Sequence, residues 1–238
     1  MRDNDTARER ERQPEVAPGP SYNEFMRVGV LLAGCGLYDG SDPAETFLLI
    51  QALDEAGERP VLLAPDRPQA RVVDHLTTAA EEGAGRNVLR ESARLVRQPV
   101  RDLAGIDPEE IEALFIPGGY GAAINFQAGF AVPGAARPLH AEVEHFLRAC
   151  LDAGKPVGTI GLGELPVRAV CGLDLPEAPS PSPRRLEVDE KRRWWHTSGA
   201  ASGARLADVR AGIAALVTSV LAAMEGRNAV VVAAGDRT

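Results

Sequence analysis

The chain has 238 residues, 45% of them hydrophobic, and a formal net charge of −8. This length and composition predict one globular domain with a single core, and the acidic balance argues against nucleic acid as a partner, because phosphate binding needs clustered Lys and Arg. The three cysteines are too few and too scattered for a disulfide framework or a cysteine zinc site, which favours a cytoplasmic location.

The two ends of the chain differ in composition from its middle. Residues 1–26 are polar and proline-bearing, lack the apolar stretch of a signal peptide, and are predicted to form a disordered tail. Residues 226–238 are expected to form a second tail, which leaves residues 27–225 as one α/β domain. The apolar segment 214–224 is shorter than the roughly 20 residues that cross a bilayer, so no membrane contact is expected.

Short apolar runs alternate with helical patterns along the domain. Val28 to Ala33 predicts a buried strand, and Pro43 opens a helix that stops at Gly57. The next elements are a strand at 59–65 and a helix at 87–95, followed by a strand at 111–116. A small-residue loop is expected at 120–136, and a helix at 139–153.

The last third begins with a strand that ends in a glycine-rich turn. Residues 176–185 carry so many prolines that they predict an exposed connection without regular structure. The segments 186–188 and 193–196 predict a small hairpin, and 206–224 a final helix. Trp194 and Trp195, adjacent in a strand, are expected to face opposite sides.

Strands that alternate with helices over short connections predict a doubly wound, mostly parallel sheet with helices on both faces. Ligands bind such sheets at the carboxyl ends of the strands. The glycine-rich turns at 34–40, 117–121 and 158–163 are therefore expected to line one crevice.

The turn within Gly154 to Glu164 has the pattern of a nucleophile elbow, in which a tight strand-to-helix turn raises one residue above the sheet. Here the raised residue is Gly161. Glycine has no side chain that can attack a substrate, so the sequence contains the scaffold of a site without its usual nucleophile.

Several spaced motifs resemble the ElbB-type branch of the ThiJ/PfpI superfamily, which is related to class I glutamine amidotransferases. They are Val30-Leu-Leu-Ala-Gly-Cys-Gly-Leu-Tyr-Asp-Gly-Ser41, Ala64-Pro-Asp66, His75-Leu-Thr77, Arg86-Asn-Val-Leu89 and Ile116-Pro-Gly-Gly-Tyr-Gly-Ala-Ala123. The resemblance covers about residues 27–163 and is weaker beyond the elbow.

The resemblance implies a flavodoxin-like three-layer sandwich, commonly a homodimer, with glyoxalase-like activity on small α-ketoaldehydes. In that family a cysteine occupies the elbow and an acidic residue of the first helix lies against it. The acidic position matches Glu45, and the cysteine position matches Gly161. A covalent route through a thiol at the elbow is therefore not available.

The candidate catalytic residues are Glu45, Glu164 and Cys35. Glu45 lies at the start of the first helix, either in the crevice as an acid or base or as an exposed glutamate stabilised by the helix dipole. Glu164 either points into the crevice or caps its own helix. Cys35 follows the first strand, which is expected to neighbour the elbow strand, and is either a substitute nucleophile or a structural cysteine.

The candidate binding residues are glycines and polar residues of the turns. The N–H groups of Gly118 and Gly119 resemble the oxyanion-binding turn of the family. Tyr120 and Asn125 are candidates for hydrogen bonds to a ligand, and Gly161 for space that a substrate fills. No metal or cofactor is expected, because no ligand spacing or phosphate-binding loop appears.

Two main hypotheses follow, with a third behind them. The first is an enzyme that performs acid/base chemistry, such as hydration, elimination, isomerisation or cyclisation, on a small carbonyl metabolite. The second is a pseudoenzyme that binds a metabolite or partner without turnover. The third is a glyoxalase-like activity that uses Cys35.

Overall fold

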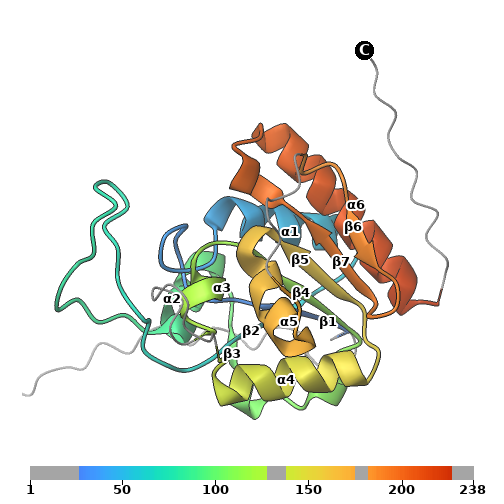
Figure 1. Cartoon of the computed structure of the whole chain (residues 1–238), viewed down its shortest axis with the longest axis horizontal. Coiled ribbons are helices and arrows are strands. Elements are labelled where there is room, and N and C mark those ends of the chain that lie inside the picture. Colours follow the sequence, from blue (N-terminus) through green and yellow to red (C-terminus); the bar gives the residue numbers. More distant parts are fainter. Residues whose placement is uncertain (1–26, 128–137, 175–181, 227–238) are drawn as a thin grey trace, which may run out of the picture.

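The computed structural model describes residues 27–127, 138–174 and 182–226. The two predicted tails and most of the proline-rich connection lie outside these residues. The rest forms a sheet with helices on both faces, the flavodoxin-like arrangement that was expected (Figure 1).

The sheet has seven strands in the order β3-β2-β1-β4-β5-β7-β6. All neighbours are parallel except β6 and β7, which form the predicted hairpin. The strands are β1 (Val28–Leu31), β2 (Val61–Ala64), β3 (Arg101–Asp102), β4 (Ala113–Ile116), β5 (Val157–Ile160), β6 (Glu187–Asp189) and β7 (Trp194–Thr197). The direction of winding changes between β1 and β4, which is where ligands bind in open parallel sheets.

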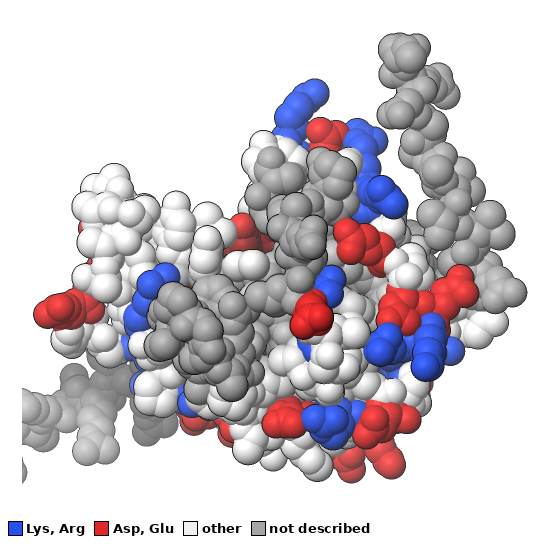
Figure 2. Space-filling view, in the orientation of Figure 1, with Lys and Arg blue, Asp and Glu red and all other residues white. Residues whose placement is uncertain are grey.

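Apolar side chains bury both faces of the sheet. The core of one face is shared with α1 (Pro43–Glu55), α2 (Val88–Val96) and α6 (Leu206–Met224), and the core of the other with α4 (Ala141–Asp152) and α5 (Glu164–Cys171). Trp194 and Trp195 belong to opposite cores, which confirms their alternation. Figure 2 shows acidic and basic side chains interspersed over α4, at the lower edge of this face.

The sequence marks the starts of α1 and α2 with capping residues. The Asp42 side chain accepts a hydrogen bond from the N–H of Ala44, and Pro43 occupies the first helical position, where its missing N–H costs nothing. The Asn87 side chain caps α2 through the N–H of Arg90. These caps place Glu45 in the first turn of α1, directed at the carboxyl edge of the sheet.

Three expectations about the elements were wrong or incomplete. Residues 121–124, expected to be loop, form the short helix α3 (Gly121–Ile124), because small residues let this turn pack closely on its surroundings. The two-residue strand β3 was not predicted, since its residues are polar. Strand β1 does not neighbour β5, because β4 lies between them.

The segment 66–87 projects from the body between β2 and α2 (Figure 1). Buried Asp39 fixes its base through the N–H of Val73, at 2.9 Å from Oδ2, and through Gln69, whose Nε2 donates to the Asp39 carbonyl at 2.6 Å. The motif residues His75 and Arg86 lie 3.7 Å and 3.9 Å from the Asp39 carboxylate oxygens. These motifs therefore hold the projecting segment.

Helix α6 is long and apolar enough to span a membrane by length and composition, with 44% of its apolar window buried. It is the one described helix that meets this test. Its buried side chains pack on the sheet with those of α1, as in the core helix of a globular domain.

Candidate functional site

The turn after β5 has the geometry of an elbow. Strand β5 ends at Ile160, Gly161 follows with a φ of +49°, and a single 3-10 turn leads into α5 at Glu164. Residues other than glycine rarely adopt a positive φ. The residue raised at a nucleophile elbow is strained because its backbone has such a conformation. Gly161 therefore occupies the raised position that the sequence predicted.

The Glu45 carboxylate lies directly against this elbow. Glu45 is 2% exposed, and a Cβ placed on Gly161 would lie 3.4 Å from Oε1 and 3.5 Å from Oε2. Two backbone groups hold the carboxylate: the Gly118 N–H donates to Oε2 at 2.9 Å and the Ala200 N–H to Oε1 at 2.7 Å. Turns that follow β4, β5 and β7 thus converge on one side chain from α1.

Burial raises the pKa of Glu45 to about 7, an effect that the two backbone hydrogen bonds oppose and the nearby Asp42 carboxylate reinforces. No basic side chain of the described residues forms an ion pair with it. The carboxyl group therefore changes between its acid and base forms near neutral pH.

Three glycines surround the carboxylate, but they do not have the same steric role. A Cβ on Gly118 would lie 2.4 Å from Oε2, and one on Gly199 would lie 2.2 Å from Oε1. Both distances are prohibitive, so these two positions must be glycine while Glu45 keeps its place. Gly161 has room for a Cβ at ordinary contact distance.

The predicted oxyanion turn is only partly available to a ligand. The N–H of Gly118 is donated to Glu45, so it is not free to bind a substrate oxygen. The N–H of Gly119 makes no hydrogen bond to another described residue. Tyr120 is 38% exposed, and its ring lies 6.3 Å from that of Tyr38 at the surface.

Asn125 is used inside the protein. Its Nδ2 donates to the carbonyls of Ala33 and Asp39 at 2.8 Å, and its Oδ1 accepts from the N–H of Ala70 at 2.9 Å. These bonds join α3 to the loop after β1 and to the projecting segment. The structure therefore gives Asn125 a structural role and does not bring it to the elbow.

Glu164 belongs to a separate buried cluster. Its carboxylate accepts a hydrogen bond from Nε of Arg168 at 2.5 Å and lies 3.9 Å from Nε2 of His196. Thr159 joins the cluster: its Oγ1 lies 3.0 Å from Nδ1 of His196 and accepts from the Trp194 indole at 2.8 Å. Burial lowers the pKa of His196 to about 4, so this imidazole stays neutral at physiological pH.

Cys35 does not approach the elbow in the way that was expected. The expectation rested on β1 lying beside β5, and the intervening β4 removes that adjacency. The half-buried thiol packs on the core that contains α2, and burial raises its pKa. A raised pKa lowers the thiolate fraction, which is the nucleophilic form.

Sequence reasoning missed the third turn of the site. Ser198, Gly199 and Ala200 follow β7 directly, and Gly199 has a φ of +57°. A glycine just after a predicted strand was the available signal, but no family motif drew attention to it. No group of three or more His, Cys, Asp or Glu side chains that could hold a metal ion occurs within the described ranges.

Comparison with known proteins identifies similar chains, although no family model matches. A human glutamine amidotransferase-like class 1 domain-containing protein 3, mitochondrial, is 42% identical over 132 residues, which are 56% of this chain and 49% of that protein. The zebrafish ES1 protein, mitochondrial, is 29% identical over 172 residues, 70% of this chain and 61% of that protein. The matched regions thus span about half to three-fifths of these two relatives.

Both relatives are mitochondrial proteins, which overturns the cytoplasmic location expected from the sequence. Among solved structures, an isoprenoid biosynthesis protein with an amidotransferase-like domain from Ehrlichia chaffeensis has a TM-score of 0.75 and 29% identity, over 82% of this chain and 99% of that one. The VC2308 protein, with a TM-score of 0.51 and 18% identity over 83% of this chain and 87% of that one, shares the fold.

These similarities agree with the expected relation to class I glutamine amidotransferases, and they add a similarity to an ES1 protein that the sequence motifs alone did not indicate. The chain is thus similar in sequence to glutamine amidotransferase-like class 1 domain-containing and ES1 proteins, and in both sequence and fold to the amidotransferase-like protein of Ehrlichia chaffeensis.

Proposed function

We propose that the chain is an enzyme that moves a proton on a small carbonyl compound, with Glu45 as the acid and base and without a covalent intermediate. The observation that carries the proposal is the Glu45 carboxyl group, which lies against the elbow glycine with a pKa of about 7. A proton-transfer group works best when its pKa lies near the working pH.

The chemistry is a proton transfer at the carbon next to a carbonyl group. The carboxylate of Glu45 removes the proton, the electron pair of the broken C–H bond moves toward the carbonyl oxygen, and the protonated Glu45 returns the proton to the same carbon or to a neighbouring atom. Elimination and isomerisation share this first step. A substrate that enters over Gly161 finds a carboxyl group instead of the thiol that the family resemblance leads one to expect.

The fixed orientation of Glu45 supports this role. Its two oxygens are held by N–H groups of separate turns, which sets the plane of the carboxyl group without neutralising it by a counter-ion. Each of those oxygens keeps a lone pair for a substrate, and one of them carries the proton when Glu45 is protonated. The N–H of Gly119, which no described residue accepts, and the room for a Cβ at Gly161 are consistent with a ligand at the same place.

A second candidate, binding without turnover, is favoured by a different observation. The Gly118 N–H, which resembles an oxyanion donor, is already donated to Glu45, and a site that lacks this donor stabilises a developing negative charge less well. In that case the small carbonyl compound is a ligand. The homodimer implied by the family resemblance stays a prediction under either function.

The experiment that tests the proposal measures exchange of the carbon-bound protons of hydroxyacetone in D2O by proton NMR. Exchange reports the first proton transfer directly, whichever product is formed. Replacing Glu45 with Gln is expected to lower the catalysed rate by about 10²- to 10⁴-fold, the usual contribution of a positioned acid or base.

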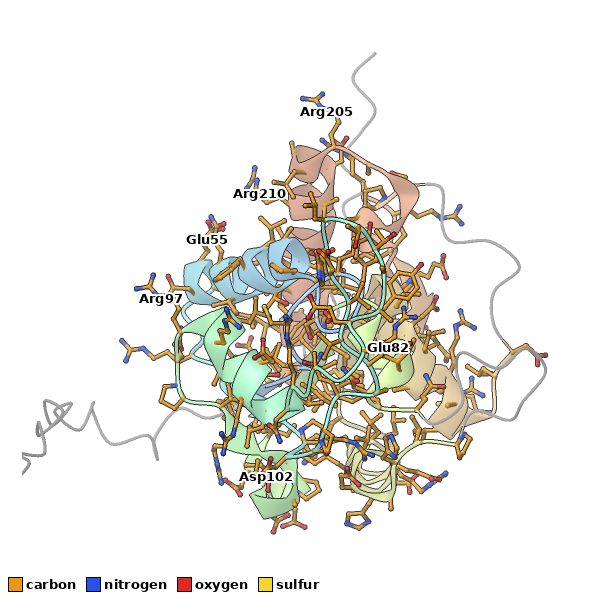
Figure 3. The ribbon with its side chains drawn as sticks, turned by 90° about the vertical axis from the view of Figure 1, so that its left-hand side faces the viewer. Glu55, Glu82, Arg97, Asp102, Arg205 and Arg210 are labelled. Atoms are coloured by element: carbon orange, nitrogen blue, oxygen red, sulfur yellow. The ribbon has the colours of Figure 1, made fainter. Side chains whose placement is uncertain are left out.

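Glu55→Gln is the matched control, because Glu55 lies on the same helix with its side chain directed away from the body (Figure 3). It is expected to exchange at the wild-type rate. Equal rates for Glu45→Gln and wild type would overturn the enzyme proposal. Binding of hydroxyacetone to the wild type without any catalysed exchange would establish the second candidate instead.

A further inference from the structure

The side-chain hydroxyl of Ser198 is buried without a hydrogen-bond partner among the described residues. Ser198 is 1% exposed, and its Oγ is fully shielded from solvent. A buried hydroxyl that gives up its hydrogen bonds to water destabilises the folded state unless something replaces them. Native proteins contain few such groups, so each calls for an explanation.

Its neighbour Thr197 shows that this turn is able to satisfy a hydroxyl. Oγ1 of Thr197 donates to the carbonyl of Pro183 at 2.6 Å. The two residues are adjacent and similarly buried, yet only Thr197 has an internal acceptor. The unpartnered state therefore belongs to Ser198 and not to the whole turn.

Ser198 lies in the immediate surroundings of Glu45. Its own carbonyl oxygen is 3.5 Å from the position of a Cβ on Gly161. The next two residues contact the Glu45 carboxylate: Gly199 packs against Oε1, and the Ala200 N–H donates a hydrogen bond to it. The turn that supplies the third side of the site thus begins with an unused hydroxyl.

We infer that Ser198 is a substrate-binding residue whose hydroxyl donates to the carbonyl oxygen of a ketone or aldehyde held over Gly161. This inference rests on the proposed function and names the group that the substrate must present: a carbonyl oxygen two bonds from the carbon that Glu45 deprotonates. As the C–H bond breaks, the electron pair moves onto this oxygen, and the Ser198 hydroxyl stabilises the resulting enolate. It replaces the donor that Gly118 has given to Glu45.

The test compares Ser198→Ala with Thr197→Val, two substitutions that each remove one buried hydroxyl. Ser198→Ala is expected to lower the kcat for hydroxyacetone exchange by about 10²-fold, the effect of losing one oxyanion donor. It is also expected to raise Tm by about 2–4 °C, because it removes an unsatisfied group. Thr197→Val is expected to lower Tm and to leave kcat within about twofold.

The outcomes separate this inference from the proposed function. If Ser198→Ala exchanges at the wild-type rate while Glu45→Gln does not, the role of Ser198 is overturned and the proposed function stands. A lower Tm in Ser198→Ala, matching that of Thr197→Val, would reveal an internal partner and also overturn it. If the wild type binds hydroxyacetone without exchange, the proposed function fails, and a Kd at least tenfold higher in Ser198→Ala would still support Ser198 as a binding residue.

Discussion

Two glutamates open helices at the same edge of the sheet and have opposite surroundings. Glu45 in α1 and Glu164 in α5 are both buried, at 2% and 7% exposure. Glu164 has a guanidinium partner one helical turn away, at 2.5 Å. Within the described residues, Glu45 is bound only by neutral N–H groups, from Gly118 and Ala200.

The difference shows what a counter-ion does for a buried carboxylate. Two backbone hydrogen bonds offset only part of the cost of burying the Glu45 charge, and its pKa is about 7. The helix N-terminus is common to both residues, so it does not account for the contrast. The Glu164 cluster is suited to holding α5 against the sheet, and Glu45 is suited to exchanging a proton.

The largest expected effect comes from removing the counter-ion of Glu164. Arg168→Met is expected to destabilise the fold by about 3 kcal/mol or more, because it leaves a buried carboxylate unpaired. Urea unfolding measures the change. Arg148→Met, which breaks an exposed pair of the same spacing with Glu144, is the control and is expected to cost less than about 1 kcal/mol.

A double variant, Glu164→Gln with Arg168→Met, completes this test. It is expected to recover part of the lost stability, since neither residue then carries a charge. A double variant less stable than Arg168→Met alone would mean that the contacts of Arg168 with Trp194 and Asp174, rather than the charge pair, account for the loss.

The next effect concerns pH. The folded state holds the proton of Glu45 up to about pH 7, whereas the unfolded chain releases it near the ordinary value of 4.5. Between these values the Glu45 carboxyl group binds more protons in the folded state, so its contribution to stability falls as pH rises and levels off above about pH 7. The difference corresponds to on the order of 3 kcal/mol.

Glu45→Gln removes this pH dependence, although it places an amide N–H2 against a backbone N–H and so carries a cost of its own at all pH values. Urea unfolding of both proteins at pH 5 and pH 8 measures the effect. The stability difference between wild type and variant is expected to shift in favour of the variant at pH 8. A difference that stays constant from pH 5 to pH 8 would show that Glu45 is ionised throughout.

The smallest expected effects distinguish the glycines around Glu45. Gly199→Ala is expected to cost about 2–3 kcal/mol, because its Cβ would displace the carboxylate. The alanine of Gly161→Ala must also adopt a positive φ, but its Cβ has room at this position. The substitution is therefore expected to lower the free energy of unfolding by about 1 kcal/mol. Thermal unfolding of the two variants measures which loses more stability. Equal losses would mean that backbone strain alone, and not contact with the Glu45 carboxylate, determines the loss in both variants.

Local patterns were enough to predict most elements. Continuous apolar runs predicted the buried strands, Pro43 and Gly57 predicted the two ends of α1, and Gly154 predicted the end of α4. Strand order was not readable in the same way, because β1, β4 and β5 are similar apolar runs and their adjacency depends on packing across the whole sheet. The wrong neighbour for β1 is what brought Cys35 into the candidate site.

The site was predictable where a family motif covered it. Glu45, Gly118 and Gly161 lie in or beside recognisable motifs, and the structure brings all three together. Ala200 lies 155 positions from Glu45 in the chain, beyond the matching region, and contributes only its backbone N–H. A backbone donor is recognised in a sequence only through the motif around it, and no family motif covers the turn after β7, so this half of the carboxylate site was missed.

The room at Gly161 also bears on how easily the protein could change its chemistry. Codons for glycine and cysteine that end in a pyrimidine differ at one base, so a single point mutation can place a thiol at the raised position of the elbow. There its Cβ fits beside a carboxyl group that is already in place. Laboratory evolution that selects for thiol chemistry would therefore begin one nucleotide change away from it.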